Sequence, residues 1–349
     1  MTAHRFAGAR RVLAGAEGTR FTGAVARIES HGRVVFERAY GTTRHDASGR
    51  RVYVDTRFDL ASLTKLFTAT LALHLAAAGK LLLDEPLGAA VPQWAGKAHA
   101  QITPRMLLAH TSGMHSGADY RTILDANVEQ FAVERELAAP PGARVIYSDL
   151  GFIALGRIVA RIAGFDLAAA IRKTFGSSTL GFRPAARELP TIPATEEDDW
   201  RGRVQGFVHD EKAYLMGGVA GHAGLFGTAA DVAALTEAYL GAFGERANGF
   251  LPATLAREAV REQAPDAVLR RGLGWALKTS ADNSCGRSMD RASFGHTGFV
   301  GTCVWADPVR DLQAVLLTNS VYFGRADTRE LRAAFYEAVV EDVDGLVRA

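Results

Sequence analysis

Ser62-Leu63-Thr64-Lys65 lies at the start of an apolar stretch, Leu60 to Ala78, that ends at Gly79. Because the stretch contains no proline and no internal glycine, it predicts one buried helix. Ser62 and Lys65 are three residues apart, which makes them neighbours on one helix face. The Ser62 hydroxyl would lie at the helix N-terminus, where free backbone N–H groups favour negative charge. These residues offer a nucleophile, an amine and part of an oxyanion site, although a helix cap with a surface lysine is the simpler alternative.

Composition excludes several classes of protein. The chain has 349 residues, and 48% are apolar, which is enough for a large core. Net charge is +2, and no dense basic run favours nucleic acid or a membrane surface. Residues 1–17 lack the apolar centre of a signal peptide, so we expect a cytoplasmic protein, or a periplasmic or secreted one if a signal was removed. The two cysteines, Cys285 and Cys303, are expected to be reduced.

Strand patterns occur at both ends of the chain, and helical patterns fill its middle. Two β-rich runs, 21–28 and 34–39, predict a hairpin that turns at His31-Gly32. Further strands are predicted at 274–279, 300–306 and 312–318. Helices are predicted after a Thr103 cap, over 127–138, after Ser148 or Asp149, over 228–239 and over 329–347. This segregation predicts an α+β fold, with a mostly antiparallel sheet flanked by helices and an inserted helical domain.

The predicted domains are discontinuous. Residues 1–80 and 270–349 form an α/β domain, residues 81–269 form a mainly helical domain, and the active site lies between them. The acidic group at 196–199 is expected to be part of a solvated loop. Positions rich in phenylalanine near Phe299 are expected in the core. His110, at a helix end, is expected to interact with the helix dipole and to orient a loop.

A metal site is not expected. His209, Asp210, Glu211 and His222 match no spacing typical of metal ligands, so we expect them to serve loop structure or to line the substrate site. The chemistry offered by Ser62 needs neither a metal nor another cofactor.

Two further stretches favour a catalytic interpretation of the Ser62 motif. They are Tyr147-Ser148-Asp149, which enters a helix after a proline-glycine break, and Gly295-His296-Thr297-Gly298, which is expected directly before a strand. Together with Ser-x-x-Lys they resemble the three motifs of the penicillin-recognising serine hydrolases, a superfamily of class C β-lactamases, D,D-peptidases and esterases. The resemblance covers about 21–340 and implies the β-lactamase/transpeptidase-like fold.

The resemblance also implies roles. Ser62 would attack a carbonyl group and form an acyl-enzyme, and either Lys65 or Tyr147 would take its proton. A tyrosine acts as a base only as the phenolate, which an adjacent ammonium stabilises. The oxyanion hole would consist of the backbone N–H groups of Ser62 and Phe299, with Thr297 and Gly298 beside it at the substrate.

Two residues depart from the family pattern. Asp149 takes the place of an asparagine; a carboxylate only accepts hydrogen bonds, and it favours a charged Lys65, which shifts the role of base towards Tyr147. A helix N-terminal anion is the alternative interpretation of Asp149. His296 takes the place of a lysine, and a neutral histidine suits a substrate carboxylate less well than a permanent cation. Both departures argue against an efficient β-lactamase.

A narrower resemblance suggests a substrate. The stretches 147–152, 206–214 and 294–299 are similar to a bacterial subgroup that includes N-acetylmuramyl-L-alanine amidases of cell-wall recycling. We therefore expect a serine hydrolase for a small amide or ester, with peptidoglycan fragments as the favoured substrate. The alternatives are a broad carboxylesterase with weak β-lactamase activity and a penicillin-binding sensor that stays acylated. Oligomeric state does not follow from the sequence.

Overall fold

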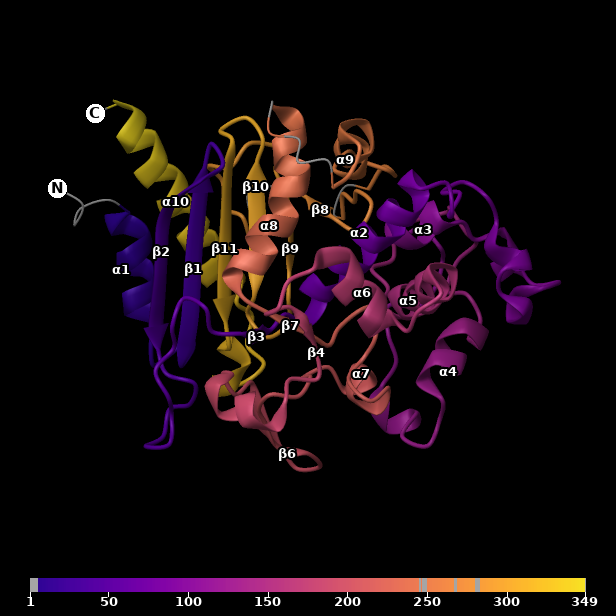
Figure 1. The fold of residues 1–349 in the computed structure, drawn as a ribbon, viewed down its shortest axis with the longest axis horizontal. Coiled ribbons are helices and arrows are strands. Elements are labelled where there is room, and N and C mark those ends of the chain that lie inside the picture. The colour runs from indigo at the N-terminus through magenta and orange to yellow at the C-terminus, as the bar shows by residue number, and fades with distance from the viewer. Residues whose placement is uncertain (1–5, 245, 247–249, 267–268, 280–282, 349) are drawn as a thin grey trace.

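The computed structural model describes residues 6–244, 246, 250–266, 269–279 and 283–348. A central sheet carries helices on both faces, and a helical part made by the middle of the chain lies beside it (Figure 1). The predicted α+β class, with an antiparallel sheet flanked by helices, is confirmed.

The sheet joins the two ends of the chain. Its antiparallel strands run in the order β2-β1-β11-β10-β9-β8. Their bounds are β1 Gly23–Ser30, β2 Arg33–Gly41, β8 Ala276–Leu277, β9 Phe294–Thr297, β10 Cys303–Asp307 and β11 Leu312–Thr318. Strand β1 pairs with β11 from Ala24 with Thr318 to Ser30 with Leu312. The predicted β1–β2 hairpin closes through His31 and Gly32, both at positive φ (53° and 69°).

Two terminal helices cover one face of the sheet. Helices α1 (Ala7–Ala16) and α10 (Arg329–Arg348) pack against each other, and Leu13, Tyr336 and Trp305 of β10 share one buried cluster (Figure 1). The sequence predicts α10 but not α1, because small residues and arginines leave α1 with few large apolar side chains.

Helices α8 (Ala229–Leu240) and α2 (Thr64–Ala77) belong to the other side. The predicted boundaries place α8 in the helical domain, yet the helix packs on β11, β10 and β1, because Val232 and Tyr239 share the buried cluster of Val315. The boundaries themselves stay a prediction. Helix α2 is buried over most of its length and packs against α5 (Asp149–Ala163), so it lies between the sheet and the helical part.

The remaining elements surround α2. The helices are α3 Pro104–Leu108, α4 Val128–Glu134, α6 Leu167–Phe175, α7 Glu211–Leu215 and α9 Ala253–Ala259. The short strands are β3 Phe58–Asp59, β4 Gly181–Phe182, β5 Glu196–Asp198, β6 Gly202–Val204 and β7 Leu225–Gly227. The 3-10 turns are η1 Ala61–Leu63, η2 Leu87–Ala89, η3 Pro92–Trp94, η4 Ala98–Gln101, η5 Tyr120–Thr122, η6 Ala186–Thr191, η7 Gly241–Phe243 and η8 Ser320–Phe323.

Side-chain caps fix where the central helices begin. Thr103 caps α3, Ser148 caps α5 and Thr228 caps α8, each by accepting a backbone N–H from the first turn. Both cysteines, Cys285 and Cys303, are buried and free. Within the described ranges, the helices are too short or too polar to cross a membrane.

Candidate active site

Ser62 lies in the short turn η1 that links β3 to α2. The carboxylate of Asp59 accepts the backbone N–H of Ala61 at 2.8 Å and that of His209 at 2.7 Å. This anchor holds Ala61 at a φ of 46°, a left-handed conformation that costs a non-glycine residue free energy. The strained turn presents the hydroxyl of Ser62 to a cavity.

Lys65 contacts Ser62 from the first turn of α2. Its Nζ lies 3.0 Å from Ser62 Oγ, 3.1 Å from the carbonyl oxygen of His222 and 2.8 Å from Asp149 Oδ1. Burial lowers the pKa of Lys65, but the Asp149 carboxylate and Tyr147 outweigh it and raise that pKa above its ordinary value. Lys65 is therefore an ammonium that donates a hydrogen bond to Ser62.

Tyr147 lies between two cations. Lys65 Nζ is 5.0 Å and Arg271 Cζ is 5.1 Å from the centre of its ring. The His110 ring packs against Tyr147 at a centroid distance of 4.6 Å, and His110 Nδ1 accepts the backbone N–H of Ser148 at 2.9 Å. His110 thus orients the loop that carries Tyr147, as predicted. Burial lowers the pKa of His110 well below its ordinary value, so its interaction with the helix dipole, which stays a prediction, would be that of a neutral ring.

His296 faces Tyr147 across the cavity, with ring centroids 6.0 Å apart. Burial lowers its pKa well below the ordinary value, so the ring is neutral. Nδ1 lies 2.9 Å from the carbonyl oxygen of Thr297, which places the proton on Nδ1. Nε2 is then an acceptor, and it is buried without a partner among the described residues.

Gly295, His296 and Thr297 lie in strand β9, and Gly298 follows its end, so most of the motif is part of a strand and does not directly precede one as predicted. Gly295 explains the difference. A Cβ there would collide with the backbone of Val304 and the ring of Trp305, so the strand needs a glycine where strand patterns usually show a larger residue.

Asp149 belongs to a closed ring of polar contacts. Its Oδ2 lies 3.3 Å from Lys212 Nζ, which lies 3.1 Å from Asp210 Oδ2. Asp210 Oδ1 lies 2.8 Å from His222 Nε2, and the His222 carbonyl returns to Lys65. Asp149 is therefore more than a helix N-terminal anion, because it bridges two buried ammonium groups.

The charges of this ring fix its ionisation. Burial raises the pKa of both carboxyls, but Lys65 and His222 outweigh it at Asp149, and His222 and Lys212 outweigh it at Asp210. Both pKa values lie below the ordinary value, and that of Asp210 lies well below it. Burial likewise lowers the pKa of Lys212, yet the two carboxylates raise it above its ordinary value.

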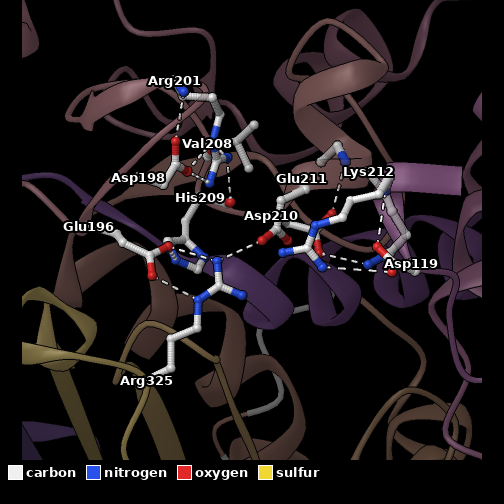
Figure 2. A network of polar contacts seen from close by, with 12 residues as sticks. Asp119, Glu196, Asp198, Arg201, Val208, His209, Asp210, Glu211, Lys212 and Arg325 are labelled. Atoms are coloured by element: carbon white, nitrogen blue, oxygen red, sulfur yellow. Dashed lines mark hydrogen bonds and ion pairs between the residues drawn. The ribbon is translucent and has the colours of Figure 1, made fainter. Parts of the chain in front are cut away.

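Asp149, Asp210 and His222 also form a set of ligand atoms that lie within 4.8 Å of one another. Each carboxylate already pairs with a lysine ammonium, which supplies the positive charge that a metal ion would supply. The four residues considered from the sequence do not assemble as one ligand set either. His209 pairs with Glu196, and Glu211 pairs with Arg325 (Figure 2).

The prediction of a solvated loop at 196–199 is right only in part: Glu197 and Asp199 are exposed, but Glu196 and Asp198 are half-buried and paired. Residues 196–198 form β5, and Glu196 binds His209 and Arg325 at 2.8 and 2.7 Å (Figure 2). Burial raises the pKa of Glu196, but Arg325 and His209 outweigh it and lower that pKa to about 2. Asp198 pairs with Arg201. Arg201 lies only three residues after Asp198, but the partners of Glu196 are distant in sequence, which composition alone does not reveal.

Phe299 corrects a second expectation. Phe294 is buried in the core as predicted, but Phe299 is 56% exposed. Its ring stacks on His209 at 5.6 Å, and Arg325 lies over it at 5.7 Å. Glu196 therefore holds His209 and Arg325, the two residues that contact the Phe299 ring, and Phe299 forms an aromatic wall of the cavity.

The cavity itself has a volume of about 670 Å³. It is lined by predicted site residues, namely Ser62, Tyr147, His296, Thr297, Gly298 and Phe299. Arg271 also lines it, and the sequence analysis missed both Arg271 and Lys212. Arg271 belongs to none of the motifs. Lys212 lies in the stretch 206–214, but nothing in that stretch indicates that its side chain pairs with Asp149 and Asp210. Lys65 and Asp149 are not among the lining residues: Lys65 contacts Ser62, and Asp149 pairs with Lys65.

Comparisons with known proteins show the family and the fold of the chain. A family model described as Beta-lactamase matches residues 9–338. The chain is 32% identical to Esterase EstB of Burkholderia gladioli, covering 91% of each protein. It is 28% identical to the N-acetylmuramyl-L-alanine amidase of Bacillus subtilis (strain 168), covering 89% of this chain and 80% of the relative. A class C beta lactamase structure matches the fold with a TM-score of 0.77 at 17% identity, covering 96% of this chain and 97% of the other.

Proposed function

The chain belongs to the Beta-lactamase family, within the penicillin-recognising serine hydrolases, and we propose that it hydrolyses a small carboxylic ester or amide through an acyl-enzyme on Ser62. The observation that carries the proposal is the contact of Lys65 Nζ with Ser62 Oγ at 3.0 Å, at a cavity that Tyr147 and His296 also line.

Tyr147 is the proposed base. Lys65 is charged and has no lone pair, so it cannot take the proton of Ser62. A Tyr147 phenolate would accept the proton while Ser62 Oγ attacks the carbonyl carbon, and the phenol would then protonate the leaving group. Water then attacks the acyl carbon while the Tyr147 phenolate takes its proton, and the phenol returns this proton to Ser62 Oγ as the acyl C–O bond breaks and the carboxylic acid is released. Lys65 and Arg271 flank the ring and would stabilise its anion.

The N–H groups of Ser62 and Phe299 are the proposed oxyanion hole. In the part of the chain that the structure describes, the Phe299 N–H donates to no acceptor. Gly298 brings it near Ser62, because a Cβ on Gly298 would lie 2.8 Å from the carbonyl oxygen of Leu60. Such a donor acts on the charge that develops on the carbonyl oxygen in the transition state.

A carboxylic ester is the substrate class we propose first, because the relative at 32% identity is named an esterase. A muropeptide amide is the second candidate, supported by the relative named N-acetylmuramyl-L-alanine amidase. The neutral His296 supports both over an efficient β-lactamase, since it supplies no permanent cation at the position of the family's lysine.

Parallel assays test these alternatives. A nitrophenyl ester, a chromogenic cephalosporin and a muramyl peptide would be given to the wild-type protein and to Ser62→Ala. We expect ester turnover by the wild type, none by the variant, and an acyl adduct on the wild type alone in intact-mass spectrometry. Turnover by Ser62→Ala near the wild-type rate would refute the nucleophile. An adduct that never clears would instead favour the acylated sensor.

A further inference from the structure

Arg271 is a cation of the cavity for which the described residues supply neither a hydrogen-bond acceptor nor an ion-pair partner. It follows Arg270 just before β8, and its guanidinium lies against the ring of Tyr147, with Cζ 5.1 Å from the ring centre. Among the described residues its side chain makes no hydrogen bond and no ion pair, and its Nε is buried and unpaired. A guanidinium in this state has lost part of its hydration and gained no acceptor.

The other arginines that line the cavity are already bound. Arg270 pairs with Glu262, Arg325 pairs with Glu196 and Glu211, and Arg332 donates to the carbonyl oxygens of Gly298 and Thr302. Arg332 keeps one buried Nε unpaired, but its outer nitrogen is bound, whereas no donor of the Arg271 side chain has a partner among the described residues.

The charges around Arg271 do not neutralise it. Lys65 is balanced by Asp149, while His110 and His296 are both neutral rings. Burial lowers the pKa of Arg271, and the charges of Tyr147 and Asp266 only partly oppose this effect. Asp327, which also lines the cavity, lies 3.7 Å from Arg329. Beside Tyr147 the guanidinium of Arg271 therefore has no carboxylate partner among the described residues, and apart from the field of Asp266 only the Tyr147 anion of the proposed mechanism would offset its charge.

On the basis of the proposed function, we infer that Arg271 binds a carboxylate of the substrate, so that the preferred esters or amides are anionic. Its planar fork of N–H groups matches the two oxygens of a carboxylate. The position is new relative to the family's three motifs, and it supplies the cation that the neutral His296 lacks. A carboxylate there would satisfy the unpaired Nε or the outer nitrogens while the scissile carbonyl lies at Ser62.

Matched pairs of esters test this inference. One pair is nitrophenyl butyrate and nitrophenyl hemisuccinate, which differ by a carboxylate on the acyl side. The other pair is nitrophenyl acetate and its carboxynitrophenyl analogue, which differ on the leaving-group side. We expect the wild type to favour the anionic member of at least one pair in kcat/KM by about tenfold or more, mainly through KM, as a charge-assisted hydrogen bond would give.

Variants identify the residue responsible. Arg271→Gln should remove this preference: kcat/KM should fall about tenfold further for the anionic ester than for the neutral ester, which loses only the effect of Arg271 on Tyr147. Arg271→Lys should keep part of the preference. Equal losses on both members would overturn the inference, because Arg271 would then act on Tyr147 rather than on the substrate. Wild-type turnover without any charge preference would also overturn it, with the proposed function intact. No turnover of any ester, or turnover that survives Ser62→Ala, would instead overturn the proposed function and this inference with it.

Discussion

Replacing Lys212 with methionine should strongly destabilise the protein, because the buried Lys212 separates two half-buried carboxylates. Its Nζ lies 3.3 Å from Asp149 and 3.1 Å from Asp210. At an effective dielectric constant of about 20, each contact corresponds to about 5 kcal/mol of Coulomb attraction. The desolvation of the buried ions offsets much of this, and loss of one partner of a buried pair typically costs about 3–5 kcal/mol. We expect Lys212→Met to lower the free energy of unfolding by about 3 kcal/mol at pH 7.

Urea unfolding followed by tryptophan fluorescence measures this loss. Lys97→Met is the matched control, because Lys97 is exposed. The loss in Lys212→Met should shrink as the pH falls into the range where the carboxyls protonate, since the repulsion then disappears. Mn²⁺ or Zn²⁺ should also stabilise Lys212→Met but not the wild type, because Asp149, Asp210 and His222 would then offer ligand atoms within 4.8 Å without an ammonium between them.

An unfolding free energy of Lys212→Met equal to that of Lys97→Met would refute the reasoning. So would a loss that is independent of pH, because it would show that methionine disturbs packing and that the two carboxylates do not repel each other.

Three further perturbations probe the site. Tyr147→Phe should lower kcat about 10²- to 10⁴-fold with little change in KM, as measured by ester kinetics; an unchanged kcat would remove Tyr147 as the base. Acid should unfold the protein steeply below about pH 4. The pKa values of Asp149 and Asp210 in the folded protein lie below the ordinary value of 3.8. The two carboxylates therefore stabilise the fold fully above the pKa of the unfolded chain, and this stabilisation is lost as the pH falls through the folded pKa values. Urea titrations at pH 7, 4 and 3 check this, and equal stability at all three would contradict it. Gly298→Ala should lower kcat about 10²-fold while circular dichroism stays unchanged, because the new Cβ would collide with Thr302 and move the Phe299 N–H away from Ser62.

Sequence motifs were sufficient to bring the reacting groups together. Ser62 and Lys65 meet because they are three residues apart, and the motifs of Tyr147 and His296 place those side chains at the same cavity. Replacement of an amide by Asp149 also predicted a charged Lys65, which the structure supports with a contact of 2.8 Å.

Other parts of the site depend on contacts that no local pattern encodes. Lys212 and Arg271 carry no motif, and their importance follows only from which groups the fold places beside them. The same holds for Glu196, whose partner Arg325 is distant in sequence. Strand β9 escaped prediction because close packing on Trp305 demands Gly295, and a glycine weakens a strand pattern.

The pairing of β1 with β11 has a consequence for synthesis on the ribosome. The β1–β2 hairpin emerges early, but its neighbour in the sheet is made almost last. Until then one edge of β1 exposes unpaired backbone groups, a surface on which strands of other chains can add. Contacts between such distant segments also form slowly. Ser62 is likewise synthesised long before His296, so the hydrolase matures only when its final strands close the sheet, and it depends on protection of that edge in the meantime.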